Sequence, residues 1–428
     1  MFSNTKFAVF ASCLTLVMLA GTPLRAQEVP PQTAGLSTLK QAFDAAWARQ
    51  PEGRSLDLQQ EAAAAQRQQA ASWLVAPPAL EASGKTDQVA KNEGNREYAL
   101  GVALPLWLPG ERQRSGALAE ANAKAVASRV LSARLRAAAT VREAWWNWQR
   151  LMGERTLAVS RLDNFRQLAG DVERRVKAGD LALADQHQAA GAVAAAEAAL
   201  AEADSNLAAA SGQLRALTGA TPLPAAADHP ESVPALSAAL SSDLADVALP
   251  DAAHPDISAL SDQAEVARRA ADLASVQRRE NPELTLAVSR ERGAFNEDWQ
   301  QALTLGVRIP LGAESRNRAK VAQARAEAIE TESRLQLERE RLAADLEASR
   351  VRVESMRVQL VAAEKRARLA HESREFFDKS FRLGESDLPT RLRIELEAAE
   401  AENLAFRARI DLAAAISALR QALGLLPE

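Results

Sequence analysis

The sequence predicts a mainly α-helical protein with a transmembrane β-barrel, built from two copies of one unit: a helix, a β-hairpin and a long helical hairpin. Three observations support this fold class. Two long stretches without proline carry helical patterns, two pairs of short segments alternate as strands do, and landmarks of the first half recur 205 residues later.

The first 26 residues are typical of a secretory signal peptide. Lys6 precedes an apolar run, residues 7–20, that is too short to cross a bilayer, and the small Ala26 precedes the expected cleavage point. We therefore expect an exported chain that begins near Gln27. Cys13 raises the alternative of a lipid anchor, but apolar residues continue beyond it, which favours a place inside the apolar run.

The composition of the mature chain excludes several kinds of site. Cys13 is the chain's one cysteine, so removal of the leader would exclude disulfides and thiolate metal sites. Of 52 basic and 56 acidic side chains only Lys6 and Arg25 lie in the leader, which leaves 50 against 56 and argues against nucleic acid as a partner. We expect no catalytic site, no cofactor and no metal site, because four histidines have no His or Cys at i+3 or i+4: His187, His229, His254 and His371.

The first structural repeat is expected at residues 27–219. Ser37 can cap its first helix, and Asp180 can cap the helix that follows the glycine turn at Gly179. The long helix before that turn would measure roughly 100 Å at 1.5 Å per residue. The expected elements are a helix at 39–75 interrupted at 51–53, strands at 79–87 and 97–106, and helices at 111–177 and 180–218.

Residues 220–256, rich in Pro, Ala and Ser, are expected to form a linker with short helices. The second repeat, residues 257–428, is expected to follow the same plan. Its elements are a helix at 257–279, strands at 283–292 and 299–309, and a helical hairpin at 316–423.

The strand candidates alternate between an apolar face and a face of small or polar residues. This pattern predicts strands with one face toward lipid and the other toward a pore. The predicted lipid-facing residues are Leu100, Val102 and Leu104 in the first repeat, and Leu303, Leu305 and Val307 in the second. The predicted pore-facing residues are Ala99, Gly101 and Ala103 in the first repeat, and Thr304, Gly306 and Arg308 in the second.

Three separate landmarks share the offset of 205 residues. Gly101-Val102 and Pro105-Leu106 recur as Gly306-Val307 and Pro310-Leu311, Gly179 recurs as Gly384, and Leu214-Arg215 recurs as Leu419-Arg420. A single spacing for three distant landmarks indicates internal duplication.

Seven-residue steps in the second long helix predict packing against neighbouring helices in a left-handed supercoil. One register holds Leu335, Leu342 and Met356, and the other holds Leu346, Val353 and Leu360. The aromatic cluster Trp145, Trp146 and Trp148 lies about 50 Å along the first long helix, too far from the strands for a membrane-interface belt. We interpret it as packing where this helix meets the shorter helices and the linker.

Four strands cannot close a barrel, and unpaired strand edges are prohibitive in lipid. Three copies of the chain would supply twelve strands, enough to close around a pore. The sequence thus predicts that the chain oligomerises, with its strands in a membrane and its long helices forming a tube that extends away from the membrane.

Duplicated strand pairs and long helical hairpins on an exported chain resemble the TolC family of outer-membrane efflux channels. Residues 98–112 and 381–393 are most similar to its heavy-metal cation branch, the CzcC-like channels. The resemblance covers nearly the whole mature chain. It implies a homotrimer with a 12-stranded barrel in the outer membrane and an α-helical barrel in the periplasm, and docking onto a periplasmic adaptor and an inner-membrane pump of the RND type.

The resemblance places adaptor docking at the two hairpin tips. Gly384 can end a helix in the left-handed conformation, Ser386 or Asp387 can cap the next helix, and Pro389 suits its first turn. The alternative is that the tips are only well-formed turns. The docking candidates are Val176, Gly179, Asp180 and Leu181 in the first tip, and Arg382, Gly384, Glu385, Ser386, Asp387 and Leu388 in the second.

Aspartates soon after the tip glycine can narrow the pore in the TolC family. Asp185 has such a position in the first repeat, whereas the second has Thr390, Arg391 and Arg393 there. A mixed ring of Asp185 with Arg391 or Arg393 could close the pore by ion pairs between protomers, although exposed pairs are weak. A solvated helix face is the alternative.

Other functions remain as alternatives. The channel could carry drugs or organic toxicants instead of metals. A periplasmic coiled-coil adaptor would have one hairpin flanked by β-rich segments, and a purely structural coiled coil would not explain the alternating strands.

Overall fold

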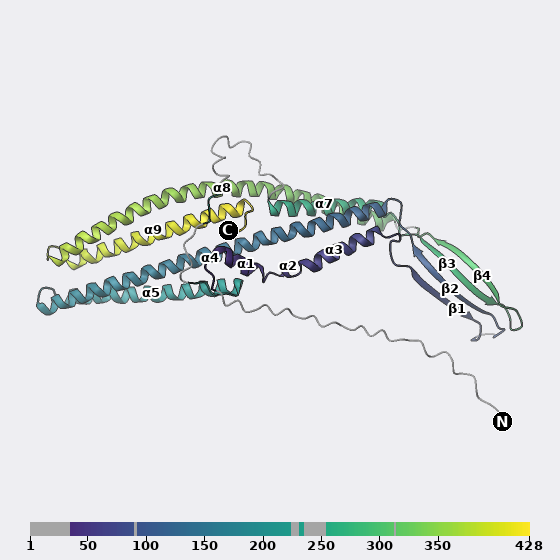
Figure 1. Cartoon of the computed structure of the whole chain (residues 1–428), viewed down its shortest axis with the longest axis horizontal. Coiled ribbons are helices and arrows are strands. Elements are labelled where there is room, and N and C mark those ends of the chain that lie inside the picture. Colours follow the sequence, from purple (N-terminus) through teal and green to yellow (C-terminus); the bar gives the residue numbers. More distant parts are fainter. Residues whose placement is uncertain (1–34, 90–91, 224–230, 235–253, 312–313) are drawn as a thin grey trace, which may run out of the picture. The chain divides into compact units, whose positions relative to one another are not determined.

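The computed structural model describes residues 35–89, 92–223, 231–234, 254–311 and 314–428, all within one compact unit, Ala34–Glu428 (Figure 1). The predicted leader, His229 and most of the predicted linker lie outside these residues.

The described elements follow one order twice. In the first half they are α1 (Leu39–Trp47), α2 (Pro51–Arg54), α3 (Leu56–Ala71), β1 (Ala79–Thr86), β2 (Arg96–Pro105), α4 (Glu111–Ala178) and α5 (Leu183–Thr218). In the second half they are α7 (Pro255–Val276), β3 (Glu283–Arg292), β4 (Gln300–Arg308), α8 (Glu314–Arg382) and α9 (Leu388–Ala422). The offset of 205 recurs at the level of elements, since α9 begins 205 residues after α5 (388 minus 183) and α7 ends 205 residues after α3 (276 minus 71).

Two predicted helix caps are wrong. Thr38, not Ser37, caps α1, because its hydroxyl accepts the backbone N–H of Gln41 at 3.2 Å. Asp180 does not cap α5, which begins three residues later; the carboxylate of Asp185 accepts the backbone N–H of Ala182 instead, at 3.1 Å. In α1 the cap is the next residue along the chain, whereas in α5 the carboxylate acts from the first turn of the helix.

The four strands form one antiparallel sheet in the order β1-β2-β3-β4. Its register aligns Leu100 with Val288 and Val288 with Leu303, so the apolar residues of both repeats share one face. That face is open: Leu100 is 57% exposed and Leu303 is 71% exposed, whereas Ala103 on the opposite face is 4% exposed. Among the described residues, β1 and β4 each have a strand partner on one side only.

The tryptophan cluster of α4 lies in the largest apolar core. Trp145, Trp146 and Trp148 pack with Phe43 of α1 and with residues of α5 and α9, and all three are at most 4% exposed. The packing role predicted from the sequence is confirmed.

Apolar residues of the two seven-residue registers of α8 pack against two neighbouring helices. Leu335 and Leu342 pack against Ile257 and Leu260 of α7. Leu346 and Val353 pack against α9, including Ile416, and Met356 of the first register also packs there. The partner helix therefore changes along α8 and not from one register to the other. None of the described helices has an apolar segment long enough to cross a membrane.

Glu111, the first residue of α4, joins the two repeats next to the sheet. Its side chain is buried and accepts N–H groups of Leu108 at 2.9 Å, Asn281 at 2.6 Å and Gln277 at 2.7 Å. Gln277 and Asn281 lie between α7 and β3 of the second repeat, whereas Glu111 follows β2 of the first repeat. The Glu111 carboxylate therefore holds the β2–α4 junction against the α7–β3 junction.

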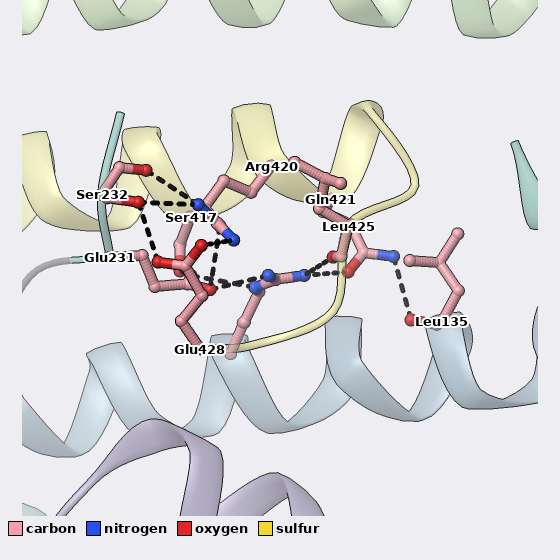
Figure 2. A network of polar contacts seen from close by, with 9 residues as sticks. Leu135, Glu231, Ser232, Ser417, Arg420, Gln421, Leu425 and Glu428 are labelled. Carbon is pink, nitrogen blue, oxygen red and sulfur yellow. Dashed lines mark hydrogen bonds and ion pairs between the residues drawn. The ribbon is translucent and has the colours of Figure 1, made fainter. Parts of the chain in front are cut away.

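A second buried carboxylate, Glu231, holds the described part of the linker against α4 and α9 (Figure 2). Arg142 of α4 donates to both of its oxygens, at 2.8 and 3.1 Å, and Arg420 of α9 lies 3.4 Å away. The hydroxyl of Ser417 donates to the same carboxylate. Arg142 lies in α4 whereas Ser417 and Arg420 lie in α9, far away in sequence, so the cluster fixes how the linker crosses these two helices.

Candidate functional site: the paired hairpin tips and the sheet

Both hairpin tips use the same backbone turn. Gly179 and Gly384 have φ values of 84° and 79°, the left-handed conformation that glycine adopts without strain. In each turn the residue after the glycine donates its N–H five residues back, Asp180 to Arg175 at 2.8 Å and Glu385 to Ser380 at 2.9 Å. This is the Schellman motif, and it confirms the predicted glycine turns.

The start of α9 also follows the sequence prediction. Asp387 is the N-cap, and its carboxylate accepts the backbone N–H of Thr390 at 3.1 Å. Hydrogen bonds from the Thr390 hydroxyl and backbone N–H lower the pKa of Asp387 below its ordinary value. Pro389 lies in the first turn, where it lacks an N–H that would have no helical partner.

The two tips are in direct contact. The guanidinium of Arg175 donates to the carbonyl of Phe381 at 2.8 Å and lies 4.9 Å from the centre of its ring. Beneath this contact, one apolar cluster includes residues of all four helices: Leu162, Phe165, Leu168, Val172, Ala189, Ala196, Phe381, Leu388 and Leu392. The two tips therefore lie side by side.

Burial divides the predicted docking residues. Leu388 is 1% exposed within the apolar cluster, so it offers no surface to a partner, contrary to the sequence expectation. Val176, Leu181 and Ser386 are half-buried, and the other candidates, Gly179, Asp180, Arg382, Gly384, Glu385 and Asp387, are exposed. Two leucines outside the predicted set, Leu183 and Leu383, are 60% and 75% exposed. Spacing alone did not distinguish the leucine that packs inward from the one that points outward.

The three gate candidates have different surroundings. Asp185 is half-buried at the start of α5. Arg391 is buried and pairs within its own chain, with Glu395 at 2.8 Å and Asp378 at 3.2 Å. Arg393 is exposed and pairs with Glu397 one turn on, at 2.6 Å. Of the two arginines, only Arg393 has a side chain open to another protomer.

Glu395, which sequence reasoning missed, links the two hairpins above the tips. It is 3% exposed and accepts hydrogen bonds from Arg391 and, at 3.1 Å, from Asn164 of α4. Arg374 of α8 lies 3.7 Å away. A carboxylate at i+4 from an arginine reads in sequence as an ordinary exposed helix pair, so nothing marked this one as buried.

The predicted pore-facing residues Thr304, Gly306 and Arg308 share one face of the sheet. The register pairs Thr304 with Ala287 and Gly306 with Thr285, which lie opposite Gly101 and Ala103 of β2. Arg308 is exposed and lies 3.5 Å from Glu283. Near the helices this face carries small residues and an ion pair, and toward the hairpin turns it carries Glu97 and Glu291.

This sheet with its helical hairpins is the fold of outer-membrane channels. Residues 42–220 match the family described as outer membrane efflux protein. The outer membrane protein VceC from Vibrio cholerae superposes with a TM-score of 0.72 at 16% identity, over 91% of this chain and 97% of that chain.

Two further solved structures are similar. CusC, described in terms of transmembrane channel formation, has a TM-score of 0.70 and 17% identity, over 91% of this chain and 92% of its own. The open state of the Neisseria gonorrhoeae MtrE outer membrane channel has a TM-score of 0.68 and 19% identity, over 91% and 89%. No curated protein sequence matches the chain. The matched family, VceC and MtrE are described as outer membrane proteins, which agrees with the location predicted from the sequence.

Proposed function

We propose that the protein is the outer-membrane channel of a tripartite efflux system, a passive exit duct for heavy-metal cations. A periplasmic adaptor and an inner-membrane RND pump deliver the cations to its helical end, which extends into the periplasm. The observation that carries the channel proposal is the sheet, with one exposed apolar face, one face of small and polar residues, and two unpaired edges.

The unpaired edges support a homotrimer. Strands β1 and β4 run antiparallel in this four-stranded meander, so β4 of one copy can pair with β1 of the next in the ordinary antiparallel way. Three copies then close twelve strands with no edge in lipid. The apolar face contacts lipid, and Thr304, Gly306 and Arg308 line the pore.

The outer face of α8 supports the same assembly. Large apolar side chains that are at least half exposed follow this helix along most of its length: Ile329, Leu337, Val351, Val358, Val361, Leu369 and Phe376. A row of this extent on one described helix is typical of a surface that a second copy covers.

The paired tips are the proposed docking surface for the adaptor. Their exposed parts combine a glycine turn with acidic residues and a leucine, Leu183 in one tip and Leu383 in the other. A helical hairpin of a partner could pack its apolar side chains on the leucines and donate to the carboxylates. Six such tips would ring the mouth of a trimer.

The gate proposal now rests on Asp185 and Arg393. We expect Asp185→Asn to raise single-channel conductance in planar bilayers by about twofold, because it removes a charge that pairs across the mouth. Asparagine keeps an oxygen for the Ala182 N–H, so the cap of α5 survives. Asp180→Asn, which changes an exposed aspartate close by at the same tip, is the matched control. An Asp185→Asn channel that conducts like wild type would remove the gate.

The heavy-metal assignment rests on the similarity of residues 98–112 and 381–393 to the CzcC-like branch. We expect a deletion strain to lose tolerance to zinc, cobalt, nickel, cadmium or copper, and the intact gene to restore it. Drugs and organic toxicants are the alternative cargo. Sensitivity to dyes and detergents with unchanged metal tolerance would favour that alternative and leave the channel itself in place.

A further inference from the structure

Two arginines face each other across the sheet near its hairpin turns. Arg96 of β2 is the register partner of Arg292 of β3. Both belong to the face that carries Leu100 and Val288, since each lies an even number of residues away. Like charges directly opposite each other destabilise a strand pair, so this pair requires a compensating group.

A third arginine and two aromatic rings complete the cluster. The guanidinium groups of Arg290 and Arg292 lie 5.1 and 5.0 Å from the centre of the Trp299 ring. Tyr98, the register partner of Arg290, lies 5.9 Å from the same ring. Contacts of this kind hold both guanidinium groups on the apolar face of the sheet.

No carboxylate neutralises these arginines within the part of the chain that the structure describes. None of the described acidic side chains forms an ion pair with Arg96, Arg290 or Arg292, and the buried Nε of Arg96 has no hydrogen-bond partner there. Arg292 donates one N–H to the carbonyl of Gly94. The Nε–H of Arg96 is buried and has no acceptor among the described residues, and the Arg96–Arg292 pair has no counter-charge there. Together these two features point to an anion that binds here.

The acidic residues nearby are directed elsewhere. Glu97 and Glu291 alternate onto the opposite face of the sheet. In the turns, Asp87 accepts the N–H of Gly94, and Glu297 accepts the N–H groups of Gly293 and Ala294. Glu97 and Glu291 therefore face away from the three arginines, and on that other face Glu97 lies opposite Lys85 of β1.

The position of the cluster defines the chemistry of the anion. It lies at the hairpin-turn end of the sheet, directly after the exposed apolar residues, where membrane strands carry aromatic girdles. If the sheet spans the membrane as proposed above, this end lies at the outer surface, and the face with the arginines meets lipid headgroups. Guanidinium groups match phosphate oxygens with paired hydrogen bonds.

We propose that Arg96, Arg290 and Arg292 bind the phosphate of a phosphorylated lipid headgroup in the outer leaflet, with Tyr98 and Trp299 against its acyl-chain boundary. The inference rests on the proposed membrane-spanning role of the sheet. It adds a lipid-binding surface on the outside of the channel, separate from the pore and from the tips.

Native mass spectrometry of the full-length protein in non-ionic detergent tests this surface. The probes are a bisphosphorylated lipid A, its dephosphorylated form and inorganic phosphate. We expect wild type to bind the bisphosphorylated lipid at least about tenfold more tightly than the dephosphorylated one, and each arginine lost to weaken binding about tenfold. Two variants are tested: the double variant Arg96→Gln/Arg292→Gln and the single variant Arg290→Gln. Arg308→Gln, on the opposite face of the same sheet, should keep the preference.

The outcomes separate this surface from the channel proposal. A wild type that is recovered as an outer-membrane trimer but shows no phosphate preference, or variants that keep it, overturns the lipid site alone. Displacement of the lipid by millimolar inorganic phosphate overturns it in favour of a free-anion site. A wild type absent from the outer membrane overturns both. The double variant removes a repulsive pair, so its trimer is expected to form, and an unheated gel checks this first.

Discussion

Replacing Glu231 by glutamine is expected to lower the free energy of unfolding by about 3–5 kcal/mol, because it leaves two buried arginines without their counter-charge. The Glu231 side chain is 3% exposed, and Arg142 and Arg420 are each 5% exposed. Water cannot replace the lost charge at such sites. The glutamine amide keeps one acceptor oxygen, but its NH2 group is a donor, so it cannot accept from Arg142 at both of the positions that the carboxylate oxygens occupy.

The loss should extend beyond the carboxylate itself. Arg142 also donates to the side chain of Gln421 at 2.6 Å and to the carbonyl of Leu425 at 3.1 Å, so it anchors the end of the chain as well as the linker (Figure 2). A guanidinium that reorients toward solvent would break these bonds. The linker and the C-terminal segment are therefore expected to detach together.

Glu428→Gln is the matched control within the same network. Glu428 pairs with Arg420 at 2.5 Å, but its side chain is 55% exposed, so its loss is expected to cost less than about 1 kcal/mol. Thermal unfolding followed by circular dichroism in detergent micelles measures both variants. Equal and small shifts for Glu231→Gln and Glu428→Gln would show that the buried cluster does not hold the fold together.

The repeated architecture was predictable because it depends on local patterns. Strand β3 has the predicted bounds, and α4 begins at the predicted Glu111. The alternation of apolar and polar residues placed Thr304 and Gly306 on one face of the strand, and the strand register of the structure places them on one face of the sheet. Periodicity of 2 or 3.6 residues and glycine turns are carried by neighbouring residues, so the chain displays them without its tertiary partners.

The buried charge clusters were not predictable because their partners are distant in sequence. Glu231 lies 89 residues from Arg142 and 186 from Ser417, within a segment that composition marks only as a linker. Glu395 has the spacing of a solvated helix pair with Arg391, and only the contact with α4 buries it. Leu388 was assigned to the surface for the same reason, since the α4–α5 hairpin that covers it is distant in sequence but adjacent in space.

Closure of the strands between copies is the central claim, and disulfide cross-linking tests it. We expect Ser83→Cys on β1, combined in turn with cysteine at Ala302, Thr304 or Gly306 on β4, to give covalent dimers and trimers on oxidation in outer membranes. All four positions share the predicted pore-facing side of the sheet. Within one chain β1 and β4 are separated by two strands, about 14 Å at 4.8 Å per strand, which is too far for a disulfide.

Single-cysteine variants are the controls and should remain monomeric on a denaturing gel. The predicted result is a ladder that stops at three chains for at least one of the β1–β4 pairs, because three copies close the ring. Monomers alone for all three pairs, or a ladder that continues beyond three chains, would contradict the trimeric channel.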